Sequence, residues 1–178
     1  HLDHEPLVDN IEEILSRCKE EGINKVLTIS TTLSGFPKIL EIVDKDKMIF
    51  GTFGIHPHET DTDQLSKDEI IKKIKSNDKI IGVGESGLDF YYNNSDKDKQ
   101  IESFKNHIDA ALDLDIPLIV HSRNAELETY EILKNCHNSL KILMHCFTGS
   151  LPFAIKLMEF NTYFSASGIC LLYTSPSP

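Results

Sequence analysis

The feature that most restricts the fold of this chain is a series of apolar, β-branched segments that each lead into a side chain able to bind a metal ion. Segments with helical periodicity separate them, and the metal-binding side chains recur about every 30 residues, roughly the length of one β-α-β unit. Because a helix must cross between two parallel strands, the ends of all the strands point the same way, and groups at those ends converge on one face. The pattern predicts a β/α barrel with a metal site on that face. The groups concerned are His1, His56, Glu85, His121 and His145.

Helical and apolar patterns predict a regular alternation of elements along the chain. The expected strands are residues 25–30, 48–55, 79–84, 117–120, 141–144 and 162–169. The expected helices are residues 6–22, 36–46, 67–76, 125–135 and 152–159, with a further helix that follows Ser95 or Asp96 and buries a stripe from Ile101 to Leu112.

The length of 178 residues is sufficient for one domain, but a complete eight-unit barrel needs roughly 250. No linker interrupts the alternation, so we expect residues 1–169 to form one domain, an incomplete α/β barrel of the TIM type. The segment 170–178 (CLLYTSPSP) breaks the pattern. We interpret it as non-native sequence that follows a truncation, with a disordered tail as the alternative.

The charge and the cysteine content of the chain restrict the classes of protein to which it can belong. A formal net charge of −10 argues against binding of nucleic acid by bulk positive charge, but not against a nuclease whose metal ions supply local positive charge. The four cysteines form no C-x-x-C pair, which fits a reducing compartment and predicts a cytoplasmic protein. No apolar stretch is long enough for a membrane span, so we expect no membrane partner.

Three residues on successive predicted strands are candidate metal ligands. Glu85 lies between glycines that let the backbone turn and keep space around the carboxylate, whose two oxygens can bridge two cations. The alternative is a solvated loop acid. His121 and His145 follow the next two apolar segments; each alone fits a hydrogen-bonded core histidine better, but the two together, after a glutamate, favour ligands.

Other polar residues near the strand ends have less specific signals. His56 and His58 flank a proline and could bind metal or phosphate, or be exposed turn residues. Arg123 could bind a phosphate bidentately or form a surface ion pair. Cys146 is adjacent to His145, but neighbours on a strand point to opposite faces, so a nucleophilic Cys-His pair is not expected. Structural or surface roles are expected for His4, His107 and His137.

Taken together, these motifs resemble the TatD family of metal-dependent deoxyribonucleases, within the amidohydrolase-like barrels. The resemblance covers residues 1 to 169 in the family's order and spacing. Its motifs are HLD at 1–3, GIHPH at 54–58, GESGLDFYY at 84–92, PLIVHSR at 117–123, HCFTGS at 145–150 and FSASGI at 164–169.

The resemblance implies a barrel that binds two divalent ions, Mg²⁺, Mn²⁺ or Zn²⁺, and hydrolyses DNA with metal-activated water. It implies an exonuclease acting on single-stranded ends, monomeric at full length. Two family ligands have no counterpart here, the first histidine of an H-x-H motif and a late aspartate, so we expect this chain by itself to be inactive and poorly folded. The implied metal ligands are His1, Glu85, His121 and His145, with Glu85 as the catalytic residue, and the implied substrate-binding residues are His56, His58 and Arg123.

Two other functions remain open from the sequence. One is an amidohydrolase-type barrel enzyme that acts on a C–N, lactone or phosphotriester bond. Such barrels usually place a lysine where a bridging group is needed, so Glu85 at that position favours the nuclease. The other is a non-catalytic remnant.

Overall fold

The computed structural model describes residues 1–92, 94–136 and 139–168. Six parallel strands form one sheet in chain order, β1 to β6, so that each strand pairs with the next one along the chain. The strands are β1 (Val26–Thr28), β2 (Ile49–Phe53), β3 (Ile80–Asp89), β4 (Leu118–Arg123), β5 (Ile142–Met144) and β6 (Thr162–Phe164).

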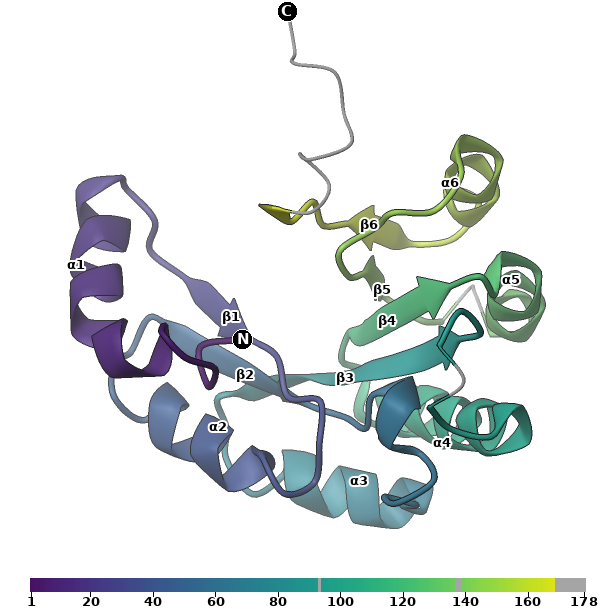
Figure 1. Cartoon of the computed structure of the whole chain (residues 1–178), viewed down its shortest axis with the longest axis horizontal. Coiled ribbons are helices and arrows are strands. Elements are labelled where there is room, and N and C mark those ends of the chain that lie inside the picture. The colour runs from purple at the N-terminus through teal and green to yellow at the C-terminus, as the bar shows by residue number, and fades with distance from the viewer. Residues whose placement is uncertain (93, 137–138, 169–178) are drawn as a thin grey trace, which may run out of the picture.

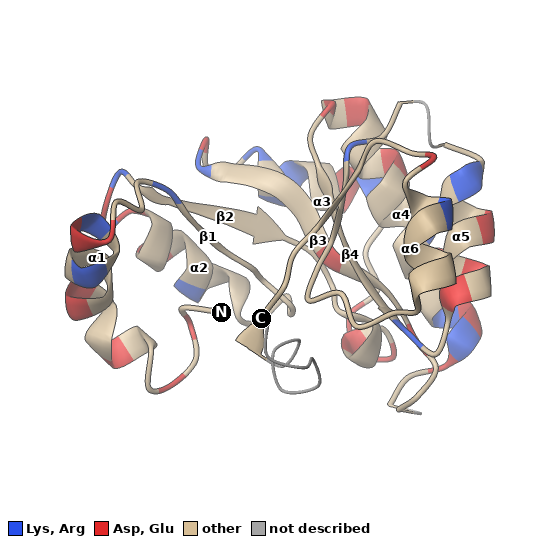
Figure 2. Ribbon diagram, turned by 90° about the horizontal axis from the view of Figure 1, so that it is seen from above, with Lys and Arg blue, Asp and Glu red and all other residues tan. Residues whose placement is uncertain are grey.

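The helices lie on the outer, convex side of the curled sheet, and the inner side is open (Figure 1). Charged residues lie mainly on these outer helices and their connections, as Figure 2 shows for α1 and α5, whereas the strands are largely uncharged. The helices are α1 (Ile11–Glu20), α2 (Phe36–Val43), α3 (Lys67–Ile74), α4 (Lys97–Leu114), α5 (Glu126–Lys134) and α6 (Leu151–Leu157), with short 3₁₀ turns η1 (Val8–Asn10) and η2 (Pro57–Glu59).

The hydrophobic core fills the space between the sheet and these helices. Phe36 of α2 packs against Phe53 of β2 with ring centroids 4.5 Å apart, and both are almost fully buried. Ile39 and Ile42 on the same face of α2 are fully buried. Because each helix buries one stripe and each strand is covered on its outer face, the chain forms one continuous layer of helices on a sheet.

Local capping fixes where two helices start. Ser66 and Glu69 form a capping box at α3, in which the serine side chain accepts the backbone N–H of Glu69 and the glutamate accepts that of Ser66. Asp96 caps α4 by accepting the backbone N–H groups of Asp98 and Lys99. Of the two residues that the sequence offers as a cap for this helix, Asp96 is therefore the one used.

Every expected strand and helix is present within the described residues, but several bounds differ. The expected strand 79–84 continues to Asp89, because its second half pairs with Val120 to Arg123 of β4. As a result His121 and Arg123 lie within a strand rather than after it. In the other direction, β6 ends at Phe164, short of the expected 169. Residue 169 and the interpreted tail 170–178 lie outside the described residues.

The inner face of the sheet is apolar and open at the end opposite the strand carboxyl termini. A pocket of about 500 Å³ lies there, lined among others by Leu27, Ile81, Ile119, Leu143 and Tyr163 from five of the strands. Ile81 is 42% exposed and Tyr163 is 67% exposed. The fold is thus a six-stranded half of a β/α barrel. In the described part of the chain, no helix combines the length and the apolar character that crossing a bilayer requires.

Candidate metal centre

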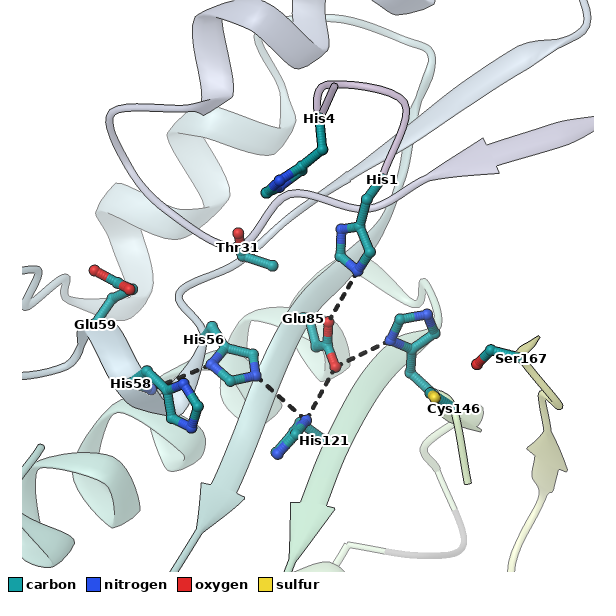
Figure 3. Close-up of a pocket in the computed structure, with 11 residues that line it drawn as sticks. His1, His4, Thr31, His56, His58, Glu59, Glu85, His121, Cys146 and Ser167 are labelled. Carbon is teal, nitrogen blue, oxygen red and sulfur yellow. Dashed lines mark hydrogen bonds and ion pairs between the residues drawn. The ribbon is translucent and has the colours of Figure 1, made fainter. Parts of the chain in front are cut away.

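A second pocket, of about 790 Å³, lies at the carboxyl ends of the strands (Figure 3). Its lining comes from loops and strand ends across the sheet, which confirms the expectation that strand-end groups converge on one face. Among the described residues that line it are six of the eight histidines of the chain, and no lysine. The lining residues are His1, His4, Thr31, His56, His58, Glu59, Glu85, His121, His145, Cys146 and Ser167.

Glu85 occupies the centre of this pocket and is only 4% exposed. It lies at an irregularity in the pairing of β3 with β4, between two glycines with positive φ. Gly84 has φ +126 and Gly87 has φ +147, and a Cβ atom at either position would overlap with a backbone carbonyl of β4, that of Ile119 or that of His121. The glycines therefore hold β3 against β4 and fix Glu85 next to His121.

Three histidines surround the two oxygens of this carboxylate. Nδ1 of His121 lies 3.2 Å and Nδ1 of His145 lies 3.0 Å from Oε1 of Glu85. Nε2 of His1 lies 4.0 Å from Oε2 (Figure 3). Glu85 is thereby shared by two groups of possible metal ligands, one with His1 and His145 and the other with His56 and His121.

The hydrogen bonds around the centre decide which ring nitrogens can coordinate a cation. Nδ1 of His1 lies 3.2 Å from the carbonyl oxygen of Ile29 and donates to it, which leaves the Nε2 lone pair directed toward Glu85. Nε2 of His121 lies 3.1 Å from Oδ2 of Asp89 and donates to it, which leaves Nδ1 facing Glu85. Nδ1 of His145 is buried and lies 3.0 Å from Oε1 of Glu85, but at an angle that does not suit a hydrogen bond.

Lone pairs on nitrogen and oxygen atoms so arranged repel one another unless a cation or a proton lies between them. Histidines that coordinate metals commonly donate their other N–H to a carboxylate or a backbone carbonyl, as His121 and His1 do here. The residues present therefore fit a divalent-cation site built on Glu85, with imidazole and carboxylate ligands suited to Zn²⁺, Mn²⁺ and similar ions.

Without cations, protons balance the negative charge of the centre, and the pKa values of Glu85 and His121 are shifted accordingly. Burial by itself raises the pKa of Glu85, but the interactions with His121 and His145 outweigh it and hold that pKa well below its usual range. Burial alone would lower the pKa of His121, yet Asp89 and Glu85 on either side raise the pKa of His121 to about 9. A cation bound at Glu85 would therefore compete with the proton on His121.

His56 and His58 lie together at η2, next to Glu85 and His121, and their ring centroids are 4.4 Å apart (Figure 3). Nδ1 of His56 accepts the backbone N–H of His58, so in the neutral ring the proton is on Nε2, 3.3 Å from Nδ1 of His121. Burial, helped by the nearby His121, lowers the pKa of His56 to about 3. His56 is therefore a neutral N–H donor at the edge of the centre rather than a cation.

Asp89 is the main residue that the sequence-based prediction missed. Its Oδ2 lies 2.8 Å from Nε2 of His58 and 3.1 Å from Nε2 of His121, and it is 1% exposed. Burial raises the pKa of this carboxyl, but hydrogen bonds from His121, the backbone of Tyr92 and His58 lower it well below its usual range. The signal was available, since a strand that continues beyond Glu85 places Glu85, Gly87 and Asp89 on one face.

Cys146 does not lie on a strand, contrary to the prediction from the sequence. β5 ends at Met144, and Cys146 adopts a left-handed backbone with φ +48, so the alternation of side chains along a strand does not apply to it. Both His145 and Cys146 line the pocket. His4, expected to be structural or surface-exposed, also lines it and forms a group of possible ligands with His1 and Asp3.

His107 does have the structural role expected of it. It is fully buried in α4, where Nδ1 donates to the carbonyl of Ser103 and Nε2 accepts the backbone N–H of Ile55. It thereby anchors the loop that leads to His56. His137 lies outside the described residues.

A parallel β/α half-barrel with a buried carboxylate shared by histidines at the strand ends is the arrangement of a barrel-type metal-dependent hydrolase. A family model described as TatD related DNase matches residues 1–175. The chain belongs to the TatD family of metal-dependent hydrolases, as the sequence motifs predict.

Relatives and solved structures agree with this assignment. An uncharacterized metal-dependent hydrolase of Buchnera aphidicola is 33% identical over 171 residues, which cover 94% of this chain and 63% of that protein. A 3'-5' ssDNA/RNA exonuclease TatD of Shigella flexneri is 26% identical over 140 residues, 78% of this chain and 54% of that protein. This chain thus spans less than two-thirds of the length of these relatives.

The crystal structure of a TatD homologue from Escherichia coli has a similar fold, with a TM-score of 0.81 at 23% identity over 92% of this chain and 64% of that one. A TatD family hydrolase from Entamoeba histolytica gives a TM-score of 0.78 at 24% identity, over 88% of this chain and 56% of that one. These likenesses confirm the barrel-type α/β fold expected from the sequence.

Proposed function

We propose that this protein is a divalent-metal-dependent nuclease that hydrolyses phosphodiester bonds in DNA, starting from single-stranded ends. The observation that carries the proposal is the centre around Glu85, where both carboxylate oxygens face histidine nitrogens whose other ring N–H is already engaged. The Shigella relative's name supports a single-stranded nucleic acid as the substrate. We further propose that the protein is cytoplasmic, monomeric at full length, and has DNA as its partner.

The proposed centre takes two divalent cations, of Mg²⁺, Mn²⁺ or Zn²⁺. Glu85 would hold them together with His1, His121 and His145. The Nε2 atom of His1 lies 4.0 Å from Oε2 of Glu85, and the Nδ1 atoms of His121 and His145 lie 3.2 and 3.0 Å from Oε1. When bound, such cations activate water as a nucleophile and stabilise the charge that develops on the phosphate oxygens.

The residues of the chain itself would position the substrate. His56 offers its Nε2–H to a phosphate oxygen. Burial keeps this imidazole neutral, so it can donate a hydrogen bond without adding a positive charge that would repel the cations. His58 is held by Asp89 at 2.8 Å beside it. Arg123, at the end of β4, supplies a guanidinium that can bind a neighbouring phosphate through two N–H groups.

The second candidate, hydrolysis of a C–N, lactone or phosphotriester bond, has less support. Among the described residues, no lysine lines the pocket, and Glu85 occupies the position in which that class of barrel needs a bridging group. A pocket of about 790 Å³ that holds six histidines provides N–H donors suited to a phosphate-rich substrate.

Metal-dependent cleavage of a labelled oligonucleotide tests the proposal. Single strands labelled at the 3' or the 5' end are incubated with a full-length form of the protein, which supplies the two family ligands without a counterpart here, and with Mg²⁺, Mn²⁺ or Zn²⁺. Parallel samples contain excess chelator or the variant Glu85→Gln. We expect stepwise shortening that both controls abolish. Hydrolysis of small esters or amides without cleavage of the oligonucleotide would instead establish the second candidate.

A further inference from the structure

Two exposed tyrosines lie directly beside the candidate metal centre. Tyr91 and Tyr92 follow β3, and they are 54% and 43% exposed. Their rings meet edge to face, with centroids 4.8 Å apart and an interplanar angle of 89°. Both backbone N–H groups donate to Oδ1 of Asp89, at 3.0 and 3.1 Å, so the turn that carries the rings is anchored to a buried carboxylate.

Arg123 from the neighbouring strand packs on these rings. The centre of its guanidinium lies 4.2 Å from the ring centroid of Tyr91 and 4.7 Å from that of Tyr92. Within the described ranges of the chain, Arg123 forms no ion pair, contrary to the surface pairing considered from the sequence. A guanidinium held on an aromatic ring still carries N–H donors at its edge, so it remains able to bind an anion.

The tyrosine pair is connected to the centre through His58. The ring of Tyr92 lies 5.5 Å from that of His58 in an edge-on arrangement, and His58 lines the pocket. The same Asp89 carboxylate that holds the tyrosine turn through Oδ1 holds His58 and His121 through Oδ2. A ligand that extends from the pocket to the tyrosines would therefore contact residues that are all held by the Asp89 carboxylate.

We propose that Tyr91, Tyr92 and Arg123 form a subsite for one unpaired nucleotide adjacent to the phosphate that is cleaved. The base stacks on the exposed tyrosine rings, and Arg123 binds the phosphate of that nucleotide. This stacking subsite deepens the proposed function and rests on it for the class of substrate. It accounts for why two large aromatic side chains remain exposed on an anchored turn at the rim of a polar pocket.

Stacking of this kind selects unpaired bases without reading their sequence. In a duplex each base is covered on both faces by its neighbours, so only a base of a single strand or a frayed end can lie on a protein ring. Every base has a flat π face, so the subsite accepts all four. The expected selectivity is for single strands over duplexes.

Binding to fluorescein-labelled strands in excess chelator tests the subsite without cleavage. The strands are a thymidine oligonucleotide, a strand of the same length whose sugars carry no bases, and a closed hairpin duplex. The double variant Tyr91→Leu/Tyr92→Leu is expected to bind the thymidine strand roughly 10- to 100-fold more weakly, the range found for loss of base stacking. Its affinity for the base-free strand should match that of the wild type.

Two matched controls separate stacking from other effects. Tyr91→Phe/Tyr92→Phe keeps both rings and should bind as the wild type does. Tyr163→Leu removes a ring that is 67% exposed on β6 and should also bind normally. Unchanged affinity of the double leucine variant for the thymidine strand overturns the subsite, and so does an equal loss on the base-free strand, which would mean contacts to the backbone only.

Metal-dependent cleavage of the base-free strand, which has no ring to stack, distinguishes failure of the subsite from failure of the proposed function. The double leucine variant should hydrolyse this strand at the wild-type rate with added metal while its KM for the single-stranded oligonucleotide rises at unchanged kcat. Base-dependent binding by a wild-type protein that cleaves no phosphodiester with any metal would refute the nuclease proposal and leave the subsite in place. An unchanged KM for the oligonucleotide would refute the subsite.

Discussion

Asp89 Oδ2 lies 3.1 Å from Nε2 of His121, and this contact determines which nitrogen of the histidine faces Glu85. In Asp89→Asn an amide N–H₂ group can take the place of Oδ2. Two donors then face each other, and the Nε2–H of His121 loses its acceptor. We expect the affinity for Mn²⁺ or Zn²⁺ to fall about 10- to 100-fold by calorimetry, the usual cost of losing such a partner. Asp61→Asn, an exposed acid that pairs with Lys99, is the control and should bind metal normally. Equal affinities in both variants would contradict the role of Asp89.

Glu85→Gln should be the most damaging conservative change. It keeps the shape of the side chain but removes the charge that would hold the cations. In a full-length form of the protein we expect at least a ~10²-fold loss of cleavage, comparable to loss of a major electrostatic contribution. The fold should survive, because the substitution preserves volume in a pocket rather than in the core. Cleavage of labelled oligonucleotide at saturating metal measures the first expectation and thermal melting the second. A near-wild-type rate would show that Glu85 has another role.

Metal ligands and substrate-binding residues should separate in calorimetry. His145→Ala removes a buried nitrogen 3.0 Å from Glu85, so it should weaken metal binding in the absence of DNA. His58→Ala removes a ring that contacts Asp89 but not Glu85, so metal affinity should change little while KM for the oligonucleotide rises. The same loss of metal affinity in both variants would show that His58 is a ligand as well.

His107 should make folding stability depend on pH. Burial lowers its pKa to about 4 from the 6.5 of an exposed histidine, so below pH 6.5 the unfolded chain binds a proton that the folded chain does not. Stability from this group is fully present at pH 7 and is lost progressively as pH falls toward 4. The loss between pH 7 and pH 5 is about 2 kcal/mol. Denaturant unfolding of wild type and His107→Gln at both pH values measures it, since the variant should lack this part of the pH dependence.

The open inner face of the sheet should make the isolated 178-residue chain self-associate. β1 and β6 are the edge strands of the sheet, and apolar residues such as Ile81 are exposed on the strands between them. We expect sedimentation to show oligomers and a hydrophobic dye to bind. Ile81→Lys should reduce both effects, whereas Leu127→Lys on the outer helix α5, where the residue is 63% exposed, should not. A monomer that binds no hydrophobic dye would show that this face does not cause self-association.

The sequence predicted the convergence of the centre because that depends on a general rule. Parallel strands joined by helices place their carboxyl ends together, so Glu85, His121 and His145 had to meet once the strands were recognised. The TatD motifs also identified the family that the comparison with the family model supports. Both inferences use patterns carried by the chain itself.

What could not be predicted depends on contacts between distant segments. The extension of β3 to Asp89 exists because β4 pairs with it, and an apolar pattern does not mark a strand whose second half is Ser-Gly-Leu-Asp. The packing of Arg123 on Tyr91 likewise joins two strands. The left-handed backbone of Cys146 has no local signal such as glycine, so the side of the chain on which it lies was predicted wrongly.

The chain-order pairing of β1 to β6 has a consequence for how the protein is made. Within the described sheet, each of the strands β2 to β6 leaves the ribosome after the strand on which it docks, so folding of these strands can advance with synthesis. The centre would be assembled in the same order: His1 and Glu85 are synthesised first, followed by His121 and then His145. A nascent chain that stalls before β5 would already contain His1, Glu85 and His121, and β5 would then bring His145 to the site.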